Sequence, residues 1–452
     1  MSQTFPKPAY RADYTCLIWH PLQAKILMLE SGLPVLTSPE SVYSAPFRVH
    51  DQILEHVNLE VRVLRRIGFE RDIAANHAWM AFELELVGDA NAIPINSYWL
   101  AEHEIDRLPL ENQRQLVQTV FLEAQQPPAL RPSWARRGWW HDALIWIDGV
   151  LEAHNASRIS FKSLKTWQIS SLSQIETTLG RLYFKAVPPF FAREPGVTSV
   201  LGQFAPEHTP EIVAINLERD WMLMKDFGDE ALTEKTKLEQ VCSALSDYAK
   251  LQIKSLEHLP QLRAAGCQHR SLEALALEIH DLLWDETLLL RDQEDGLSSA
   301  QIKRLRELEP EFVRRCKTLS KLGIPDMLEH GDLWRNNVNF CQGRTVFYDW
   351  TDAAIAFPLQ SVPLSELEPE VWGSDARDTL TEAYLEPFTV FAPMFVLKEA
   401  FDLVQPLIEL YRAVNYRRFI IPGTEDKKES QAGLIWLLGN ALNIMGAVEV
   451  IA

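Results

Sequence analysis

The sequence contains few cysteines, and none is placed to build a disulfide framework or a zinc site. Its 452 residues include five cysteines, an odd number, and no Cys-x-x-Cys pair. The N-terminal residues also lack the features of a secretory signal peptide. Because disulfides persist mainly in oxidising compartments, these features predict a cytoplasmic protein with reduced, buried thiols.

Basic charge is also scarce. The chain carries 44 Lys and Arg against 62 Asp and Glu, which gives a formal net charge of −18 at pH 7. An acidic surface argues against nucleic acid and anionic membranes as partners, and it is compatible with a cationic small-molecule substrate. A solvated surface is the simpler explanation for clusters such as Glu366, Glu368, Glu370 and Asp375. The oligomeric state does not follow from the sequence.

Long hydrophobic runs without polar residues are missing as well. The most apolar segment, Gly433–Ala452, includes Asn440, Asn443 and Glu449. Because polar and charged groups are costly in lipid, we expect this segment to be a helix buried in a large helical lobe and not a membrane span.

The chain is too long for a single core, so two or three domains are expected. Residues 1–125 have mixed patterns: short β-strand signals within Tyr14–Glu30 and Ala78–Leu86, and apolar residues at helical spacing across Asp51–Ile67. This mixture predicts a small α+β accessory domain. Three prolines and an Arg/Trp cluster mark residues 126–140 as a linker, where tryptophans pack at a domain junction.

The remaining chain divides into a strand-rich and a helix-rich part. Residues 141–231 form the predicted small lobe, whose strand candidates are Trp167–Ser171, Arg181–Ala186, Ile212–Ile215 and Trp221–Met224. Residues 232–452 form the predicted helical lobe. Its amphipathic segments are Leu232–Ser255, Ser271–Leu290, Ser298–Leu322, Ser374–Ala413 (broken near Pro387 and Pro393) and Lys427–Val450.

One motif interrupts the helical pattern and carries the chemistry. The sequence His330-Gly331-Asp332-Leu333-Trp334-Arg335-Asn336-Asn337-Val338 is followed by Phe347-Tyr348-Asp349-Trp350. The order Asp332, Asn337, Asp349 fits ATP-dependent phosphoryl transfer, in which one Asp orients a substrate hydroxyl while Asn and a second Asp hold Mg²⁺. A capped turn would explain Asp332 and Asn337 alone, but it leaves Asp349 unexplained.

This motif resembles the aminoglycoside phosphotransferase and choline kinase family, which shares its fold with protein kinases. The resemblance covers about residues 140 to 452. It implies a two-lobed kinase-like fold with Asp332 as the catalytic base, and with Asn337 and Asp349 as the ligands of Mg²⁺. It implies that His330 holds the loop and that ATP is the phosphoryl donor, although GTP stays open.

The resemblance also implies ATP-binding residues in the small lobe. Lys185, in the strand sequence Tyr-Phe-Lys-Ala-Val, is the candidate for contacting the α- and β-phosphates, and Glu194 is the candidate for orienting it. A surface Lys on an edge strand and a first-turn helix Glu are the alternatives that involve no ligand. Pro195, directly after Glu194, is compatible with a helix start.

Two protein-kinase signatures need separate treatment. A Gly-x-Gly-x-x-Gly phosphate loop is missing, which this family tolerates. The tripeptide Asp226-Phe227-Gly228 lies before the catalytic loop and not after it, so we interpret it as part of the hinge between lobes. There, backbone groups of Leu223, Met224 and Lys225 are the candidates for binding adenine.

The sequence departs from the family pattern after Asp349. Where the family carries a Pro-x-x-Asp element, this chain has Phe357-Pro358-Leu359-Gln360-Ser361, and Asp352 is the residue that could compensate. No substrate-specific pattern follows Ser361.

The N-terminal domain resembles a Nudix fold. Residues Arg62–Phe69 can be aligned with the end of a Nudix box, but arginines stand at 62, 65 and 66 where metal-binding glutamates belong. Because these cations would repel Mg²⁺, we expect no Nudix hydrolase activity. The arginines are open to binding an anion or pairing with another domain.

Together these observations predict an α+β protein: a Nudix-like accessory domain followed by a kinase-like small lobe and a helical large lobe. The predicted function is MgATP-dependent phosphorylation of a hydroxyl on a small molecule. The main alternative is a regulatory module that binds nucleotide without transferring phosphate. A protein kinase is disfavoured, because no activation-loop-like segment follows Asp349.

Overall fold

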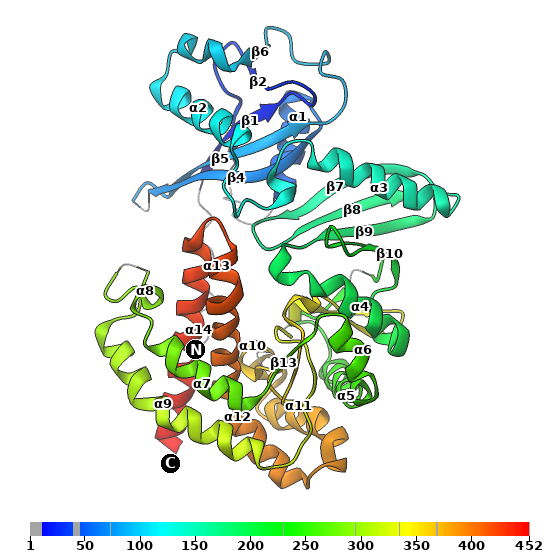
Figure 1. Cartoon of the computed structure of the whole chain (residues 1–452), viewed down its shortest axis with the longest axis vertical. Helices are drawn as coiled ribbons and strands as arrows, with labels where there is room; N and C mark the ends of the chain where they lie inside the picture. Colours follow the sequence, from blue (N-terminus) through cyan, green and yellow to red (C-terminus); the bar gives the residue numbers. More distant parts are fainter. Residues whose placement is uncertain are drawn as a thin grey trace. The chain divides into compact units, whose positions relative to one another are not determined.

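The computed structural model describes residues 11–38, 46–72, 74–228, 230–293, 295–333, 335–367 and 369–451. The chain divides into two compact units (Figure 1). One comprises Met1–Pro188 with Trp221–Leu223, and the other comprises Pro189–Asp220 with Met224–Ala452. Both units contain helices and strands, as the α+β prediction requires. The domain boundaries expected at residues 125, 140 and 231 stay predictions.

A mixed sheet begins the first unit. Its order is β4-β5-β1-β2-β6, with β3 paired to β1, and β1 runs parallel to β5. The strands are β1 (Arg11–Trp19), β2 (Lys25–Met28), β3 (Val35–Ser38), β4 (Val61–Asp72), β5 (His77–Leu86) and β6 (Tyr98–Ala101), and the helices are α1 (Pro46–Val57) and α2 (Glu111–Gln125). The strands expected within Tyr14–Glu30 and Ala78–Leu86 are therefore confirmed.

The helix expected across Asp51–Ile67 is wrong in its second half. Helix α1 ends at Val57, the next residue, Asn58, has a positive φ of 55°, and β4 follows from Val61. Residues 61–64 are all buried, so burial shows no alternation of two faces here. The apolar spacing read as helical therefore belongs to a strand, which is fixed by its antiparallel pairing with β5.

The Nudix resemblance rested on that helix and is not confirmed. The aligned segment lies in β4, and its arginines serve the packing of the unit. Arg65 forms ion pairs with Glu83 on β5 at 2.6 Å and with Glu123 on α2 at 2.5 Å. Arg65 therefore pairs inside its own unit, and not with another domain as the sequence had left open.

A helix and an antiparallel meander complete the first unit: α3 (Trp139–Ala153), β7 (Arg158–Thr166), β8 (Ser171–Thr177) and β9 (Gly180–Ala186). The strand expected at Trp167–Ser171 is wrong, because Trp167–Ser170 form the turn between β7 and β8. The Trp167 indole donates to the Ser170 hydroxyl at 2.7 Å. Helix α3 was not predicted, although its buried residues Trp140, Ala143, Ile147 and Leu151 are at helical spacing.

Aromatic side chains form the core between α3 and this meander. The Trp139 ring lies 4.8 Å from Trp140 and 5.3 Å from Trp221, and Trp140 lies 4.9 Å from Phe161 on β7. Their interplanar angles of 85°, 87° and 73° are edge-to-face arrangements, which aromatic pairs prefer. The tryptophans therefore pack in a core inside the first unit, and the domain junction at which they were expected stays a prediction.

The second unit is mainly helical. Its helices are α4 (Arg193–Phe204), α5 (Leu238–Ser255), α6 (Leu259–Ala264), α7 (Leu272–Leu283), α8 (Glu286–Leu289), α9 (Ser299–Ser320), α10 (Leu364–Leu367), α11 (Ala376–Leu385), α12 (Met394–Asn415), α13 (Ile421–Gly423) and α14 (Lys427–Ile451). The helices expected from Leu232 onward are confirmed, with later starts, and the proline break falls between α11 and α12 as expected. No helix in these described ranges is both long and apolar enough to cross a bilayer.

Two small sheets lie among these helices. One has the order β12-β15-β16 and the other β13-β17-β14. Their strands are β12 (Glu230–Ala231), β13 (Gln268–Arg270), β14 (Met327–Glu329), β15 (Val338–Cys341), β16 (Arg344–Phe347) and β17 (Ala354–Ala356). These short strands frame the predicted motif.

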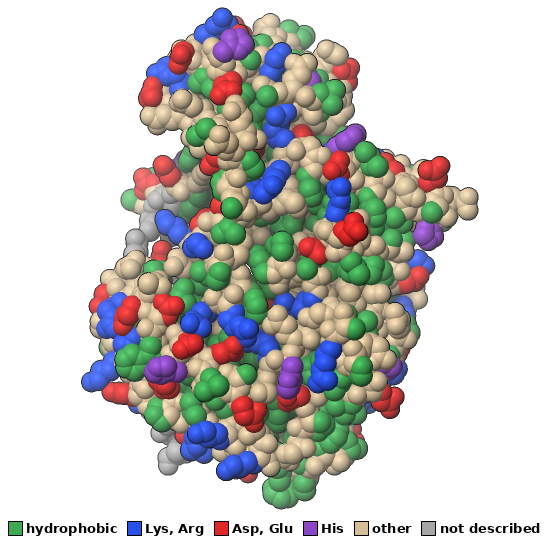
Figure 2. All heavy atoms as spheres, in the orientation of Figure 1, with side chains coloured by type: hydrophobic (Ala, Val, Ile, Leu, Met, Phe, Trp, Pro, Cys, Tyr) green, Lys and Arg blue, Asp and Glu red, His purple; other side chains and the backbone are tan. Residues whose placement is uncertain are grey.

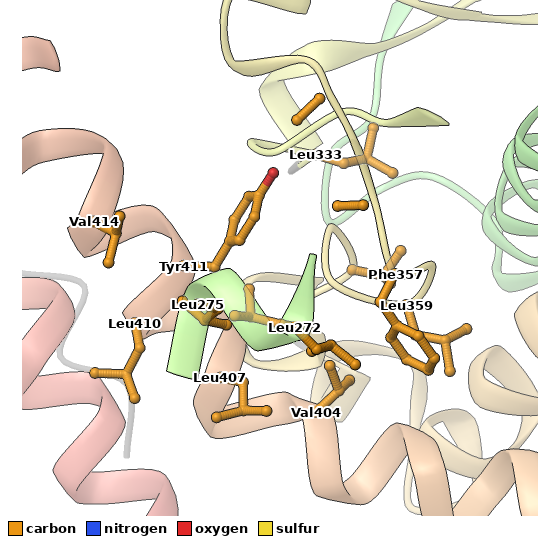
Figure 3. Packing of buried hydrophobic residues seen from close by; sticks show 14 of the residues in the cluster. Leu272, Leu275, Leu333, Phe357, Leu359, Val404, Leu407, Leu410, Tyr411 and Val414 are labelled. Carbon is orange, nitrogen blue, oxygen red and sulfur yellow. The ribbon is translucent and has the colours of Figure 1, made fainter. Parts of the chain in front are cut away.

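The core of the second unit reaches the motif directly (Figure 3). Tyr411 on α12 points toward the loop that carries Leu333, and Val404 and Leu407 continue the same helix face. Leu333 is buried with 4% exposure. Acidic and basic side chains are interspersed on the face drawn in Figure 2, without a large patch of one sign.

We expect Trp140→Ala to destabilise the first unit by about 3–5 kcal/mol, because a fully buried indole is removed from the aromatic core. The matched control is Ile145→Ala on the same helix, where the side chain is 59% exposed and the expected change is within about 0.5 kcal/mol. Hydrogen exchange of the β8 and β9 amides under increasing urea measures both values. Equal effects of the two variants would contradict the assigned core.

Candidate functional site

The motif residues are brought together by one short β-hairpin. Strand β15 pairs antiparallel with β16, with Val338 opposite Phe347. At the open end of the hairpin, the Tyr348 N–H donates to the Asn337 carbonyl at 3.2 Å. Asn337 and Asp349 therefore lie at the same end of the hairpin, as two residues that share a ligand must.

Asp332 is attached to the same point. The Asn337 side-chain amide donates to the Asp332 carbonyl at 2.8 Å and lies 3.5 Å from a carboxylate oxygen of Asp332. The neighbouring Leu333 is buried, whereas the Asp332 side chain is 32% exposed. The core thus anchors the loop through Leu333 while the Asp332 carboxylate stays accessible. Residue 334, which the motif includes, lies outside the described residues.

Gly331 permits the close contact between the loop and the turn after Asp349. Its φ is +80°, and a Cβ at this position would lie 2.6 Å from the Asp352 carbonyl oxygen. A positive φ and a backbone contact this short both exclude other residues, so the glycine of the His-Gly-Asp sequence is required by geometry.

Asp349 has an unusual backbone conformation. It is in the left-handed region at φ 68° and ψ 58°, directly before the 3-10 turn Trp350–Asp352. Its carboxylate accepts from the Thr351 hydroxyl at 3.1 Å. A non-glycine residue in this region costs free energy and is found more often at functional sites than elsewhere.

The side chains present are suitable for Mg²⁺. Because the amide nitrogen of Asn337 is engaged with Asp332, its oxygen is the atom presented to a ligand, and Asp349 supplies a carboxylate. Mg²⁺ prefers such oxygen ligands and usually keeps waters or substrate phosphates as further ligands. Within the described ranges, no cluster of three or more His, Cys, Asp or Glu forms an all-protein metal cage.

Two further charged residues complete the site, of which the sequence did not assign Arg412. Arg412 on α12 donates to Asp332 at 2.9 Å. Asp352 is half-buried and accepts from the Asn415 amide at 2.9 Å. Burial, followed by the charge of Asp332, raises the pKa of the Asp352 carboxyl to about 6. The sequence gave no signal for Arg412, because the ion pair spans 80 residues.

Ser361, which stands where the family carries an aspartate, belongs to a buried network of hydrogen bonds. The Gly331 N–H donates to the Ser361 hydroxyl at 2.9 Å, and that hydroxyl donates to Glu329. Glu329 also accepts from the side-chain amide of Gln252. Burial raises the pKa of the Glu329 carboxyl well above its usual value, so its hydrogen bonds offset an expensive desolvation.

The residue that takes the place of the missing family aspartate therefore differs from Asp352, which the sequence suggested. A serine occupies the position of the family aspartate, and the carboxyl group that stands behind it belongs to Glu329, while Asp352 is bonded to Asn415. Asp352 is not the compensating residue. The network also explains why a serine suffices, since its hydroxyl both accepts from the loop and donates to Glu329.

His330 fixes the loop from the other side. Its Nε2 lies 3.0 Å from the Tyr348 carbonyl, its backbone N–H donates to the Tyr248 hydroxyl at 2.9 Å, and its ring packs 4.5 Å from Trp350. The side chain is fully buried. These contacts agree with the predicted role of holding the loop.

The predicted nucleotide-binding residues are distributed over both units. Lys185 is buried on β9 and Leu223 lies on β11 (Trp221–Lys225), both in the first unit. Glu194 is fully buried in the first turn of α4, in the second unit, and α4 contacts the turn that follows Asp349. The pairing of Lys185 with Glu194 stays a prediction.

The hinge interpretation of Asp226-Phe227-Gly228 is compatible with its contacts. The Asp226 carboxylate accepts from the Gly228 N–H at 3.0 Å, and Asn339 donates to the Phe227 carbonyl at 3.2 Å. Asp226 thus closes its own turn. Met224 and Lys225 precede it, and the Lys225 N–H donates to the Glu211 carbonyl at the start of β10 (Ile212–Asn216) at 2.9 Å.

Residues 171–386, which contain all three motif residues, match the phosphotransferase enzyme family (APH). This match covers part of the predicted strand-rich lobe and part of the predicted helical lobe, and the kinase-like α+β fold is confirmed. A sequence comparison with curated proteins found no match.

Several solved structures are similar. The GDP and kanamycin complex of APH(2")-IIia is 15% identical, with a TM-score of 0.48 over 67% of this chain and 98% of that one. An ethanolamine kinase from Plasmodium vivax is 10% identical, with a TM-score of 0.44 over 74% and 89%. A choline kinase from Cryptosporidium parvum is 13% identical, with a TM-score of 0.46 over 64% and 90%.

We expect Glu329 and Ser361 to be energetically coupled. Ser361→Asp alone places two carboxylates together in a buried site, and it should lower stability by about 3–5 kcal/mol. Adding Glu329→Gln restores one donor and one acceptor, so the double variant should be at least about 2 kcal/mol more stable than the sum of the single variants predicts. Urea unfolding of the wild type, the two single variants and the double variant measures the coupling free energy between the two positions. Additive effects would show that the network does not hold the loop as described.

Proposed function

Because residues 171–386 form a domain of the phosphotransferase enzyme family, we propose that this chain transfers the γ-phosphoryl group of MgATP to a hydroxyl of a small molecule. The observation that carries the proposal is an accessible Asp332 carboxylate held next to Asn337 and Asp349 at one end of a hairpin. Phosphoryl transfer uses this combination of a positioned carboxylate and oxygen ligands for metal.

In the proposed mechanism, Asp332 receives the acceptor hydroxyl. Its carboxylate orients the oxygen for attack on the γ-phosphorus and takes the proton as the new P–O bond forms and the bond to ADP breaks. Since the transition state of phosphoryl transfer is loose, most of the acceleration comes from positioning, and the proton moves late. The rigid anchors on both sides of Asp332, Leu333 and His330, keep its position fixed.

Asn337 and Asp349 would hold Mg²⁺. When bound, the metal neutralises charge that develops between the β- and γ-phosphates. The protein contributes two oxygen ligands whose orientations are fixed, one through the Asn337 amide bond to Asp332 and one through the Thr351 bond to Asp349. Fixed ligands need no rearrangement during the reaction, and this lowers the barrier.

The nucleotide is proposed to be held by Lys185, oriented by Glu194, and by the backbone of Leu223, Met224 and Lys225. Lys185 and Glu194 are both buried, as groups that act on phosphate in a water-poor site should be. A cytoplasmic location is proposed from the cysteine pattern of the sequence. Burial raises the pKa of the Cys16, Cys267 and Cys316 thiols to about 12, whereas Cys242 and Cys341 are only half-buried, so the expectation of buried thiols is confirmed for three of the five.

A regulatory module that binds nucleotide without transfer is the second candidate. It would need Lys185 and the metal ligands, but not a carboxylate held accessible at the position of the base. The exposure of Asp332 beside fully buried neighbours therefore favours the enzyme.

We predict that Asp332→Asn lowers kcat by about 10²–10⁴-fold while the Kd for MgATP changes less than about threefold, because the shape of the site is kept and only the base is removed. Coupled ADP release with a pool of hydroxyl compounds measures kcat, and calorimetry measures MgATP binding. Asp106→Asn is the matched control, since Asp106 is exposed in the turn Glu102–Arg107, away from every residue assigned to the site. Full activity in Asp332→Asn would contradict the assigned base.

A further inference from the structure

Arg412 lies where an acceptor must arrive. Its guanidinium donates to one carboxylate oxygen of Asp332 at 2.9 Å, and the other oxygen faces the Asn337 amide at 3.5 Å. An acceptor hydroxyl that bonds to Asp332 therefore comes within contact distance of the guanidinium. Arg412 has five N–H donors in a planar fork, so it can bond Asp332 and an acceptor oxygen at the same time.

The position of Arg412 is fixed by its surroundings. Glu409, one helical turn earlier, is fully buried with a carboxylate oxygen 4.0 Å from the guanidinium. The guanidinium also lies 6.0 Å from the ring centre of Trp436 on α14, whose side chain is 50% exposed. Helices α12 and α14 lie side by side here (Figure 1). The arginine is thus held between a buried carboxylate and an exposed aromatic ring.

Tyr416 lies one helical turn after Arg412 and is the candidate for a second donor; Arg412, Tyr416 and Trp436 are called the wall of the site. Tyr416 follows α12 in a π-helical turn, Tyr416–Ile420, a distortion that occurs frequently at functional sites. Gly433 on α14 leaves space for it, because a Cβ there would lie 2.7 Å from the tyrosine ring. Burial, followed by the charge of Asp332, raises the pKa of Tyr416 to about 12, so its hydroxyl stays a neutral donor.

We propose that the acceptor carries an anionic oxygen group, a carboxylate or a phosphate, next to the hydroxyl that is phosphorylated, and that Arg412 with Tyr416 binds this group. The inference rests on the proposed function and adds the substrate class. Planar carboxylate and phosphate groups match the arginine fork, and a phenol hydroxyl completes such a site. Arg412 is thus the residue that determines specificity.

The same geometry disfavours a cationic acceptor, which the acidic composition allowed. An ammonium group bonded near Asp332 would lie beside the guanidinium, and like charges at this distance repel. The exposed ring of Trp436, the natural cation-binding surface of this wall, already faces Arg412. Net charge describes the whole surface, whereas the acceptor meets the guanidinium of Arg412, which is paired with Asp332.

Four probes with one three-carbon skeleton test the proposal on the full chain: glycerate, glycerol 3-phosphate, glycerol and 3-amino-1,2-propanediol. Calorimetric titration in the presence of MgADP measures their affinities, and ADP release from MgATP measures turnover. At least one anionic probe should bind ten times or more tighter than glycerol and the amine. Comparing glycerate with glycerol 3-phosphate shows which anion the site takes.

Substitutions of Arg412 and Tyr416 test whether these two residues cause the preference for anionic probes. Arg412→Gln should abolish the preference for the anion, Arg412→Lys should keep part of it, and Tyr416→Phe should weaken anion binding about three- to tenfold without changing the fold. Arg304→Gln on the exposed face of α9 removes the same charge and should leave the preference unchanged. If Arg412→Gln does not fold, the lysine and phenylalanine variants decide.

Anionic probes that bind no tighter than glycerol, or an amine that binds best, would overturn the proposal. So would a preference for the anion that survives in Arg412→Gln. These results would leave the phosphotransferase assignment intact, because that assignment fails separately, through loss of MgATP binding or full activity in Asp332→Asn.

Discussion

The buried hydrogen bonds from Glu329 through Ser361 to Gly331 are the constraint on which the site depends. They hold the loop that carries Asp332, in a buried region where an unsatisfied carboxyl would cost several kcal/mol. Gly331 then lets this loop approach the backbone of Asp352, so that the loop packs closely against the turn after Asp349. Chemistry that relies on positioning requires this rigidity, because small displacements of the base lower the rate strongly.

Asp332 has polar and charged neighbours on two sides. Asn337 and Asp349, the proposed metal ligands, lie on the side of the hairpin, and Arg412 lies on the side of α12. Asp332 is therefore placed between the proposed nucleotide and acceptor positions. Burial, followed by the charge of Asp332, raises the pKa of the Asp352 carboxyl. A cation bound beside these carboxylates would lower it, because a nearby positive charge favours the ionised form.

The sequence was sufficient for the motif because a short hairpin leaves few ways to place Asn337 and Asp349. The large helices were also predictable from their apolar spacing. Glu329, Arg412 and the role of Ser361 were not, since each depends on contacts between elements distant along the chain. The helix expected across Asp51–Ile67 failed for the same reason: pairing of β4 with β5 outweighed a local helical pattern.

Phosphorus-31 NMR of the full chain with MgATP and a pool of hydroxyl compounds tests the central claim most directly. The account predicts that the γ-phosphate resonance of ATP decreases while a new phosphomonoester resonance grows by the same amount, together with ADP. A γ-phosphate resonance that stays unchanged, or one that is converted only into inorganic phosphate, would contradict the account.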